Sequence, residues 1–143
     1  MSRRVWAGIG LLATGVGGLV ASLSLGSRPT TYAAGPVPSC GDFPNCARVA
    51  VPFHQSPSEV LAAARSALVA SGVVEFRETD GGAEAVATAG PFKDDVLLAV
   101  EATETGSLLW VRSASRLGRN DLGVNAHRVR RLVDSVRQRL SQG

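Results

Sequence analysis

A chain of 143 residues, 45% of them hydrophobic, allows one small domain, and a domain of that size folds without a metal or several disulfides. Its 15 basic and 12 acidic residues give a net charge of +3, and the excess is arginine in the C-terminal third. Because the N-terminus predicts export, this excess points to anionic lipid or an acidic protein surface, and nucleic acid is not expected as a partner.

The first residues predict a membrane anchor or an export signal. Arg3 and Arg4 precede Val5–Ser27, which contains no charged residue, so the N-terminus is expected in the cytoplasm and the rest of the chain across the membrane. The run is long enough to span a bilayer. Small residues recur every four positions, which would let another transmembrane helix pack closely. These residues are Gly10, Thr14, Gly18 and Ser22. We expect residues 1–27 to be a single-pass inner-membrane anchor in the lipid bilayer; the alternative is a signal peptide cleaved near Ala33, which releases the protein into the periplasm.

A linker and two cysteines follow. Residues 28–39 are rich in proline, glycine and threonine, which is typical of an extended tether. Cys40 and Cys46 lie close together in a segment expected to be exported, and this spacing predicts a disulfide that closes a small loop. The alternative is a metal site, but such a site needs about four ligands and the sequence has no second pair of cysteines. The extracytoplasmic domain is expected over residues 40–143.

The first helix is expected after a clear start signal. Ser56 can cap the helix, Pro57 suits its first turn, and Glu59 completes a capping box. Apolar residues then follow at helical spacing until Gly72, where the helix is expected to stop. These core residues are Val60, Leu61, Ala64, Leu68 and Val69.

Two β-hairpins are expected next. A strand over residues 73–79 leads into Asp80-Gly81, a strong signal for a two-residue turn. This turn sets the register, which places Phe76 with Ala85 and Val74 with Ala87 on the core face, and Arg77 with Glu84 on the other. A second hairpin starts with a strand over residues 95–101 and turns at Thr105-Gly106. Its predicted pairs are Val100 with Val111, Leu98 with Ser113, Val96 with Ser115, and, on the outer face, Asp95 with Arg116.

The last helix is expected to begin at Asn125, a favourable capping residue. Its apolar residues at helical spacing are Val129, Leu132, Val133, Val136 and Leu140. The predicted order is helix, four antiparallel strands, helix. This is a two-layer α+β domain in which two helices cover one face of a four-stranded sheet. The uncovered face would carry Trp110, Leu97, Arg112 and Arg116.

The sequence offers little for catalysis. Ser113 or Ser115, His127 and Asp121 are the candidates for a hydrolase triad, but both serines are predicted to point into the core and no nucleophile elbow presents them. We therefore expect no enzyme, with a hydrolase that uses Ser115 and His127 as the alternative. Two histidines (His54 and His127) and two oxidised cysteines do not form a metal-ligand set, and no phosphate-binding loop is present, so neither a metal nor a cofactor is expected.

Arginines provide the candidate binding residues. Together with a helix N-terminus they could converge on an anion. The candidates are Trp110, Arg112, Arg116, Arg119 and Arg128. In the alternative interpretation the arginines pair internally, Arg116 with Asp95 and Arg112 with a neighbour such as Glu101, while Asp121 and Asn125 fix the loop.

The C-terminal block also carries a family resemblance. The residues that carry it are Arg112-Ser-Ala-Ser-Arg116, Gly118, Asp121-Leu-Gly123, Asn125 and Arg128-Val129, with Pro44-Asn-Cys46 and Phe92-Lys-Asp-Asp-Val96 upstream. Together they resemble the family of domain of unknown function 1499, in which an arginine often stands where this chain has Ala126. Within the block we interpret six residues as structural: Ser113, Ser115, Gly118, Asp121, Gly123 and Asn125. The resemblance implies an exported or membrane-tethered protein and no established activity, cofactor or substrate.

We expect a non-catalytic accessory or structural subunit, held at the periplasmic side of the inner membrane, that binds a membrane protein complex. The small-residue stripe, the tether and an exposed Trp110 among arginines motivate this hypothesis, since aromatic and arginine side chains are frequent in contact hot spots. The alternative is an extracytoplasmic binder of a small anionic or lipid-like ligand that uses the open sheet face with Arg112 and Arg116.

Overall fold

The computed structural model describes residues 35–143, so the predicted anchor, with Gly10, Thr14, Gly18 and Ser22, lies outside the described residues. Within residues 35–143, no helix has both the length and the apolar character that crossing a membrane requires. The elements in chain order are β1 (Cys46–Phe53), α1 (Pro57–Ala70), β2 (Glu75–Thr79), β3 (Gly82–Ala89), β4 (Phe92–Thr103), β5 (Gly106–Ser115) and α2 (Val124–Ser141).

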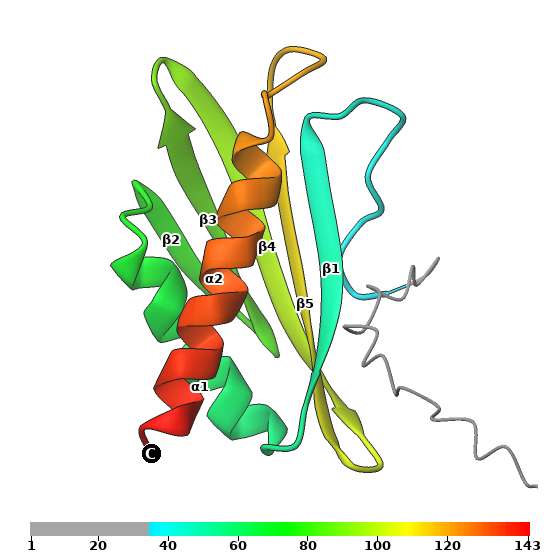
Figure 1. The fold of residues 1–143 in the computed structure, drawn as a ribbon, viewed down its shortest axis with the longest axis vertical. Helices are drawn as coiled ribbons and strands as arrows, with labels where there is room; N and C mark the ends of the chain where they lie inside the picture. The colour runs from blue at the N-terminus through cyan, green and yellow to red at the C-terminus, as the bar shows by residue number, and fades with distance from the viewer. Residues whose placement is uncertain (1–34) are drawn as a thin grey trace, which may run out of the picture.

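The strands form one antiparallel sheet in the order β1-β5-β4-β3-β2, and both helices cover the same face of it (Figure 1). The predicted α+β class is confirmed, but the sheet has five strands where four were predicted. β1 is the missed strand. It contains Pro52, which cannot donate a backbone hydrogen bond and therefore weakens a strand prediction. Proline is tolerated here because β1 lies at the edge of the sheet, beside β5.

The predicted start of α1 is confirmed in detail. Ser56 is the N-cap residue, and its side chain and that of Glu59 form the two halves of a capping box. The Ser56 amide donates to Glu59 Oε2 at 3.0 Å, and the Glu59 amide donates to Ser56 Oγ at 3.4 Å. Val69 was placed in the core, yet it is 53% exposed, and Ala67, two residues earlier, is buried instead.

The first hairpin has the predicted register, with Phe76 opposite Ala85 and Arg77 opposite Glu84. The second hairpin does not. Its turn is Glu104-Thr105, because Thr103 pairs with Gly106, and Val100 therefore lies opposite Leu109. Gly106 belongs to the strand because the backbone of Phe53 and His54 passes so close that a Cβ atom there would collide with it. The shift is an even number of residues, so every side chain keeps its predicted face.

A main core and a smaller second core lie on opposite faces of the sheet. The main core joins the helices to the inner face and includes Val60, Leu68, Val96, Val111 and Val136. The second core consists of Val37, Ala50, Leu108 and Trp110, with Leu97 and Ala99 packed against it. The outer face is therefore partly covered.

Trp110 is 2% exposed, so the prediction of an exposed Trp110 was wrong. The chain around Gly35–Val37 crosses the outer face and covers the indole, and Gly35 lies so close that a Cβ atom there would stand 2.5 Å from the ring. The Arg48 guanidinium sits 4.5 Å from the ring centroid, and Trp110 Nε1 donates to Glu101 Oε2 at 2.6 Å. Sequence periodicity identifies the face of a strand correctly but carries no information on which distant segment covers it.

Candidate functional site

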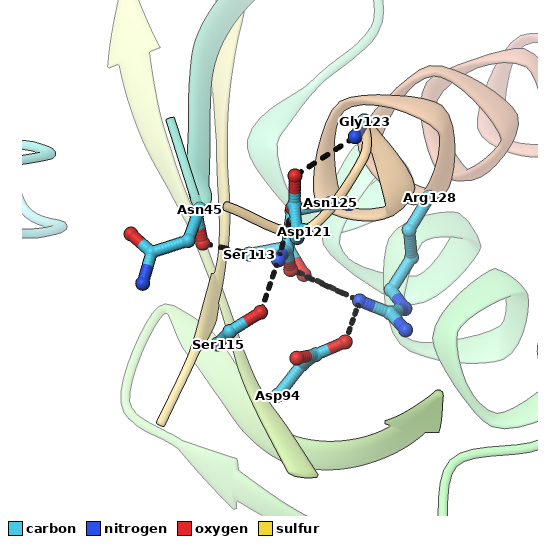
Figure 2. Close-up of polar contacts among 8 residues, drawn as sticks. All are labelled: Asn45, Asp94, Ser113, Ser115, Asp121, Gly123, Asn125 and Arg128. Atoms are coloured by element: carbon cyan, nitrogen blue, oxygen red, sulfur yellow. Dashed lines mark hydrogen bonds and ion pairs between the residues drawn. The ribbon is translucent and has the colours of Figure 1, made fainter. Parts of the chain in front are cut away.

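Asn125 lies at the centre of a buried polar network where the β5–α2 loop meets the sheet (Figure 2). It was predicted to cap α2, but the N-cap is Gly123, with a φ of 81°, and Asn125 is a fully buried helix residue. Its Nδ2 donates to Asp121 Oδ2 at 2.6 Å, to Ser115 Oγ at 2.8 Å and to the Asn45 carbonyl at 3.1 Å. Its Oδ1 accepts a 2.5 Å hydrogen bond from Ser113 Oγ. One side chain thus joins β5, the helix start and the segment before β1.

Asp121 performs the capping that was expected of Asn125. Its carboxylate accepts hydrogen bonds from the backbone amides of Gly123 and Asn125, both at 2.9 Å. Partial burial acts to raise the pKa of Asp121, but the hydrogen bonds from Asn125 and Gly123 outweigh it and hold that pKa below its usual value. Near a helix N-terminus a carboxylate is also favoured by the helix dipole.

We expect the contribution of Asp121 to stability to disappear in acid. Because its folded pKa lies below the unfolded value of 3.8, the contribution is complete above that value and is lost as the pH falls through the folded pKa. Urea unfolding of the Asp121→Asn variant should therefore differ most from wild type near neutral pH, and the difference should shrink below about pH 4. A difference that stays constant from pH 7 to pH 3 would contradict this assignment.

An ion pair lies under the network. Asp94 is 1% exposed, and its Oδ2 is 2.7 Å from Nη1 of Arg128, whose side chain is 15% exposed. The same Nη1 donates to Ser113 Oγ and to Asn125 Oδ1, each at 3.0 Å. Arg128 Nη1 lies close to Asp94 but is poorly aligned with it, so neither carboxylate oxygen accepts a hydrogen bond from the residues that the structure describes. Asp94 is therefore held by charge attraction to Arg128, without a hydrogen bond to its carboxylate from the described residues.

The disulfide loop docks against this network. Cys40 and Cys46 form the predicted disulfide, which closes the loop just before β1. Asn45, within that loop, donates from Nδ2 to the Gly118 carbonyl at 2.6 Å, and its own carbonyl accepts from the Ser115 amide at 2.9 Å. The bridge thus holds Asn45 where it can fix both ends of the β5–α2 loop.

The arrangement does not resemble a hydrolase site. Ser113 is fully buried, and Ser115 Oγ accepts from Asn125. His127 is exposed and lines a different groove, between the end of α1 and the start of α2. Across residues 35–143, no three His, Cys, Asp or Glu side chains are grouped so as to hold a metal ion.

The candidate arginines do not converge, which corrects that prediction. Arg116 bonds Asp95 Oδ1 through Nε at 3.0 Å and Nη2 at 2.7 Å on the outer sheet face. Arg128 lies on the opposite, helix-covered side of the sheet with Asp94. Arg119 lies 5.1 Å from the ring centroid of Phe43. The prediction failed because residues near one another in the sequence project from both faces of one strand and from a loop.

Four exposed apolar residues belong to three segments beyond the network, the β3–β4 hairpin, the disulfide loop and the β5–α2 loop, which lie at the same end of the domain (Figure 1). Leu122 is 91% exposed and Leu117 is 72% exposed, and Phe92 and Phe43 are about half-exposed. We call these four residues the end patch. The sequence analysis missed it, although two isolated leucines in a polar, glycine-rich loop were a visible signal.

The chain matches the model of a known protein family. The sequence profile of a family described as "Protein of unknown function (DUF1499)" matches residues 31–136, which cover the network and both loops that hold it. No curated protein matches the chain.

Proposed function

This chain belongs to the DUF1499 family, and on that premise we propose that it is a non-catalytic binding module that docks on a partner protein through the end patch. One observation carries the proposal: Leu122 is 91% exposed and has a φ of 54°. A left-handed conformation costs an L-residue about 1–2 kcal/mol, and exposing leucine to water adds nothing to folding. A strained and exposed apolar residue is more consistent with binding than with stability.

The buried network supports the proposal because it shapes the loop that carries Leu122. The Leu122 amide donates to Asn120 Oδ1 at 2.9 Å, and the amide of the next residue, Gly123, donates to Asp121. Asp121 is fixed in turn by Asn125. A loop whose backbone is held at successive residues presents its side chains with little loss of conformational entropy on binding.

The composition of the end patch also suits a protein partner. The Arg116 amide donates to the Lys93 carbonyl at 3.0 Å, so the β4–β5 pairing continues past its last residue pair and brings Leu117 opposite Phe92. Arg119, stacked on Phe43, supplies a cation at the rim. Aromatic and arginine residues around an apolar centre are characteristic of contact hot spots.

The proposed partner is a membrane protein complex. The predicted membrane anchor over residues 1–27 motivates this part of the proposal, since an anchor would confine the module to the periplasmic side of the inner membrane. Confinement raises the effective concentration of the module near membrane partners, so a small patch suffices for stable association.

The proposal can be tested by crosslinking the full chain in cells. A photoreactive phenylalanine analogue placed at Leu122 is expected to give a discrete protein adduct that is retained after detergent extraction. The same analogue at Glu104, exposed in the β4–β5 turn at the other end of the domain, is the matched control and should give none. Identical adducts at both positions, adducts to lipid alone, or migration of the uncrosslinked protein alone in native gels would contradict the proposal.

Leu122→Asn should separate binding from stability. Asparagine tolerates the left-handed conformation, so we expect the variant to be more stable by about 0.5–1 kcal/mol in urea unfolding. Combined with Leu117→Ser, it should nevertheless abolish the crosslink made from a probe at the neighbouring Phe43. A crosslink that survives in this stable double variant would show that the leucines do not bind the partner.

A further inference from the structure

The outer face of the sheet carries a groove that lies apart from both the end patch and the buried network. It has a volume of about 480 Å³, spans β2 to β5, and is lined by Phe76, Val86, Leu97, Arg112 and Arg116, with three acids. The main-chain segment that covers Trp110 leaves this part of the face open. Its floor is apolar at Leu97 and Val86, while its walls are charged.

Almost every charge in the groove is already neutralised. Glu84 pairs with Arg77, Asp95 pairs with Arg116 at 2.7 Å, and Glu75 lies 3.5 Å from Lys93. Each of the three lining carboxylates therefore has a cation of its own. Arg112 is the remaining arginine, and its side chain makes no hydrogen bond or ion pair with residues 35–143.

The lack of a partner for the Arg112 side chain lowers the stability of the fold, because its Nε is buried and makes no hydrogen bond. The carboxylate that the sequence suggested for it, Glu101, accepts from Trp110 Nε1 instead. Across the strand pair Arg112 lies directly opposite Arg48, a like charge, and on its other side lies Leu97. Buried guanidinium nitrogens are normally bonded, and like charges opposite one another destabilise a sheet.

We propose that this groove binds a small molecule that carries a single anionic group on an apolar body. The guanidinium of Arg112 binds the anionic group, carboxylate or phosphate diester, with its planar set of donors. The apolar body lies over Leu97 and Val86. A single anionic group is specified because one cation is uncompensated, and any further negative charge would meet the acids along the walls.

The test uses the full chain in phosphatidylcholine nanodiscs, with arginine labelled at ¹⁵Nε, and octanoate as the probe. Titration should shift one Nε–H resonance, which is assigned to Arg112 by its absence from Arg112→Gln. The affinity for octanoate should fall at least tenfold in Arg112→Gln and stay unchanged in Arg137→Gln, an exposed arginine of α2 that lies outside the groove and pairs with Asp134. Equal binding of octanol, no binding of octanoate, or unchanged affinity in Arg112→Gln would each overturn the proposal.

Leu97→Glu provides a second and independent variant. It places a carboxylate directly opposite Arg112, so it should abolish octanoate binding, and circular dichroism should show that the variant is folded. Retained binding in this variant would overturn the proposal. Nanodiscs that contain phosphatidylglycerol distinguish the source of the anion. If the Arg112 resonance is already shifted in those discs and does not respond to octanoate, the ligand is a lipid headgroup. If the resonance responds to octanoate in both kinds of disc, the ligand is a free amphiphile.

Discussion

Replacing Asn125 with aspartate is expected to lower the free energy of unfolding by about 3–4 kcal/mol at neutral pH. The substitution keeps the shape of the side chain but replaces a nitrogen that donates to three oxygens with a fourth oxygen. It also brings a second carboxylate to 2.6 Å from Asp121 Oδ2 in a site that excludes water. Loss of donors and like-charge repulsion therefore act together.

Urea unfolding measured across a pH series provides the check. The loss of unfolding free energy should be smaller in the double variant Asn125→Asp/Asp121→Asn, because the second substitution removes the repulsion and restores a donor. The matched control is Asn120→Asp, because Asn120 is an exposed residue of the same loop that uses only its acceptor oxygen; its effect should stay within about 0.5 kcal/mol. If Asn125→Asp unfolds like wild type, the network does not hold the loop.

Asp94→Asn is expected to cost about 3 kcal/mol. The substitution leaves the Arg128 guanidinium mostly buried without a counter-charge, and breaking a buried pair at one partner is more harmful than replacing both. Arg128→Met should be harmful for the reciprocal reason. The double variant Asp94→Asn/Arg128→Met should recover a large part of the loss, because it leaves no unpaired charge.

Thermal unfolding of the four proteins in this double-mutant cycle measures the coupling between Asp94 and Arg128. The adjacent residue provides the control. Asp95 faces solvent on the other side of the same strand and pairs with Arg116, so Asp95→Asn should cost no more than about 1 kcal/mol. Equal losses for Asp94→Asn and Asp95→Asn would show that burial of the first pair has no energetic consequence.

Local sequence signals predicted the local parts of the fold. The capping box at Ser56 and Glu59 and the Asp80-Gly81 turn involve residues within a few positions of each other, and both are present as predicted. The second turn failed because Gly106 is required by the close approach of Phe53 and His54. That requirement is long-range, and a two-residue turn signal cannot reveal it.

For the candidate site, the sequence predicted some of the residues that belong to it but not the contacts between them. The stretch from Ser113 to Asn125 was recognised as a structural block, but its partners come from elsewhere in the chain, Asn45 before β1 and Asp94 on β4. No periodicity connects these segments, because they meet only after β1 joins the sheet as the neighbour of β5. The end patch was missed for a related reason: the exposure of Leu122 depends on the loop shape that those partners impose.

The packing of Gly35–Val37 over Trp110 determines where the domain can be cut. A recombinant fragment that begins at Cys40 keeps the helices and strands described within residues 35–143, yet it loses Val37 and leaves the indole facing water. Such a fragment would aggregate more readily than the parent protein, because it exposes an apolar surface that the parent protein covers. Because the chain has two tryptophans and the other, Trp6, would be removed, the emission wavelength of the fragment would report this exposure directly.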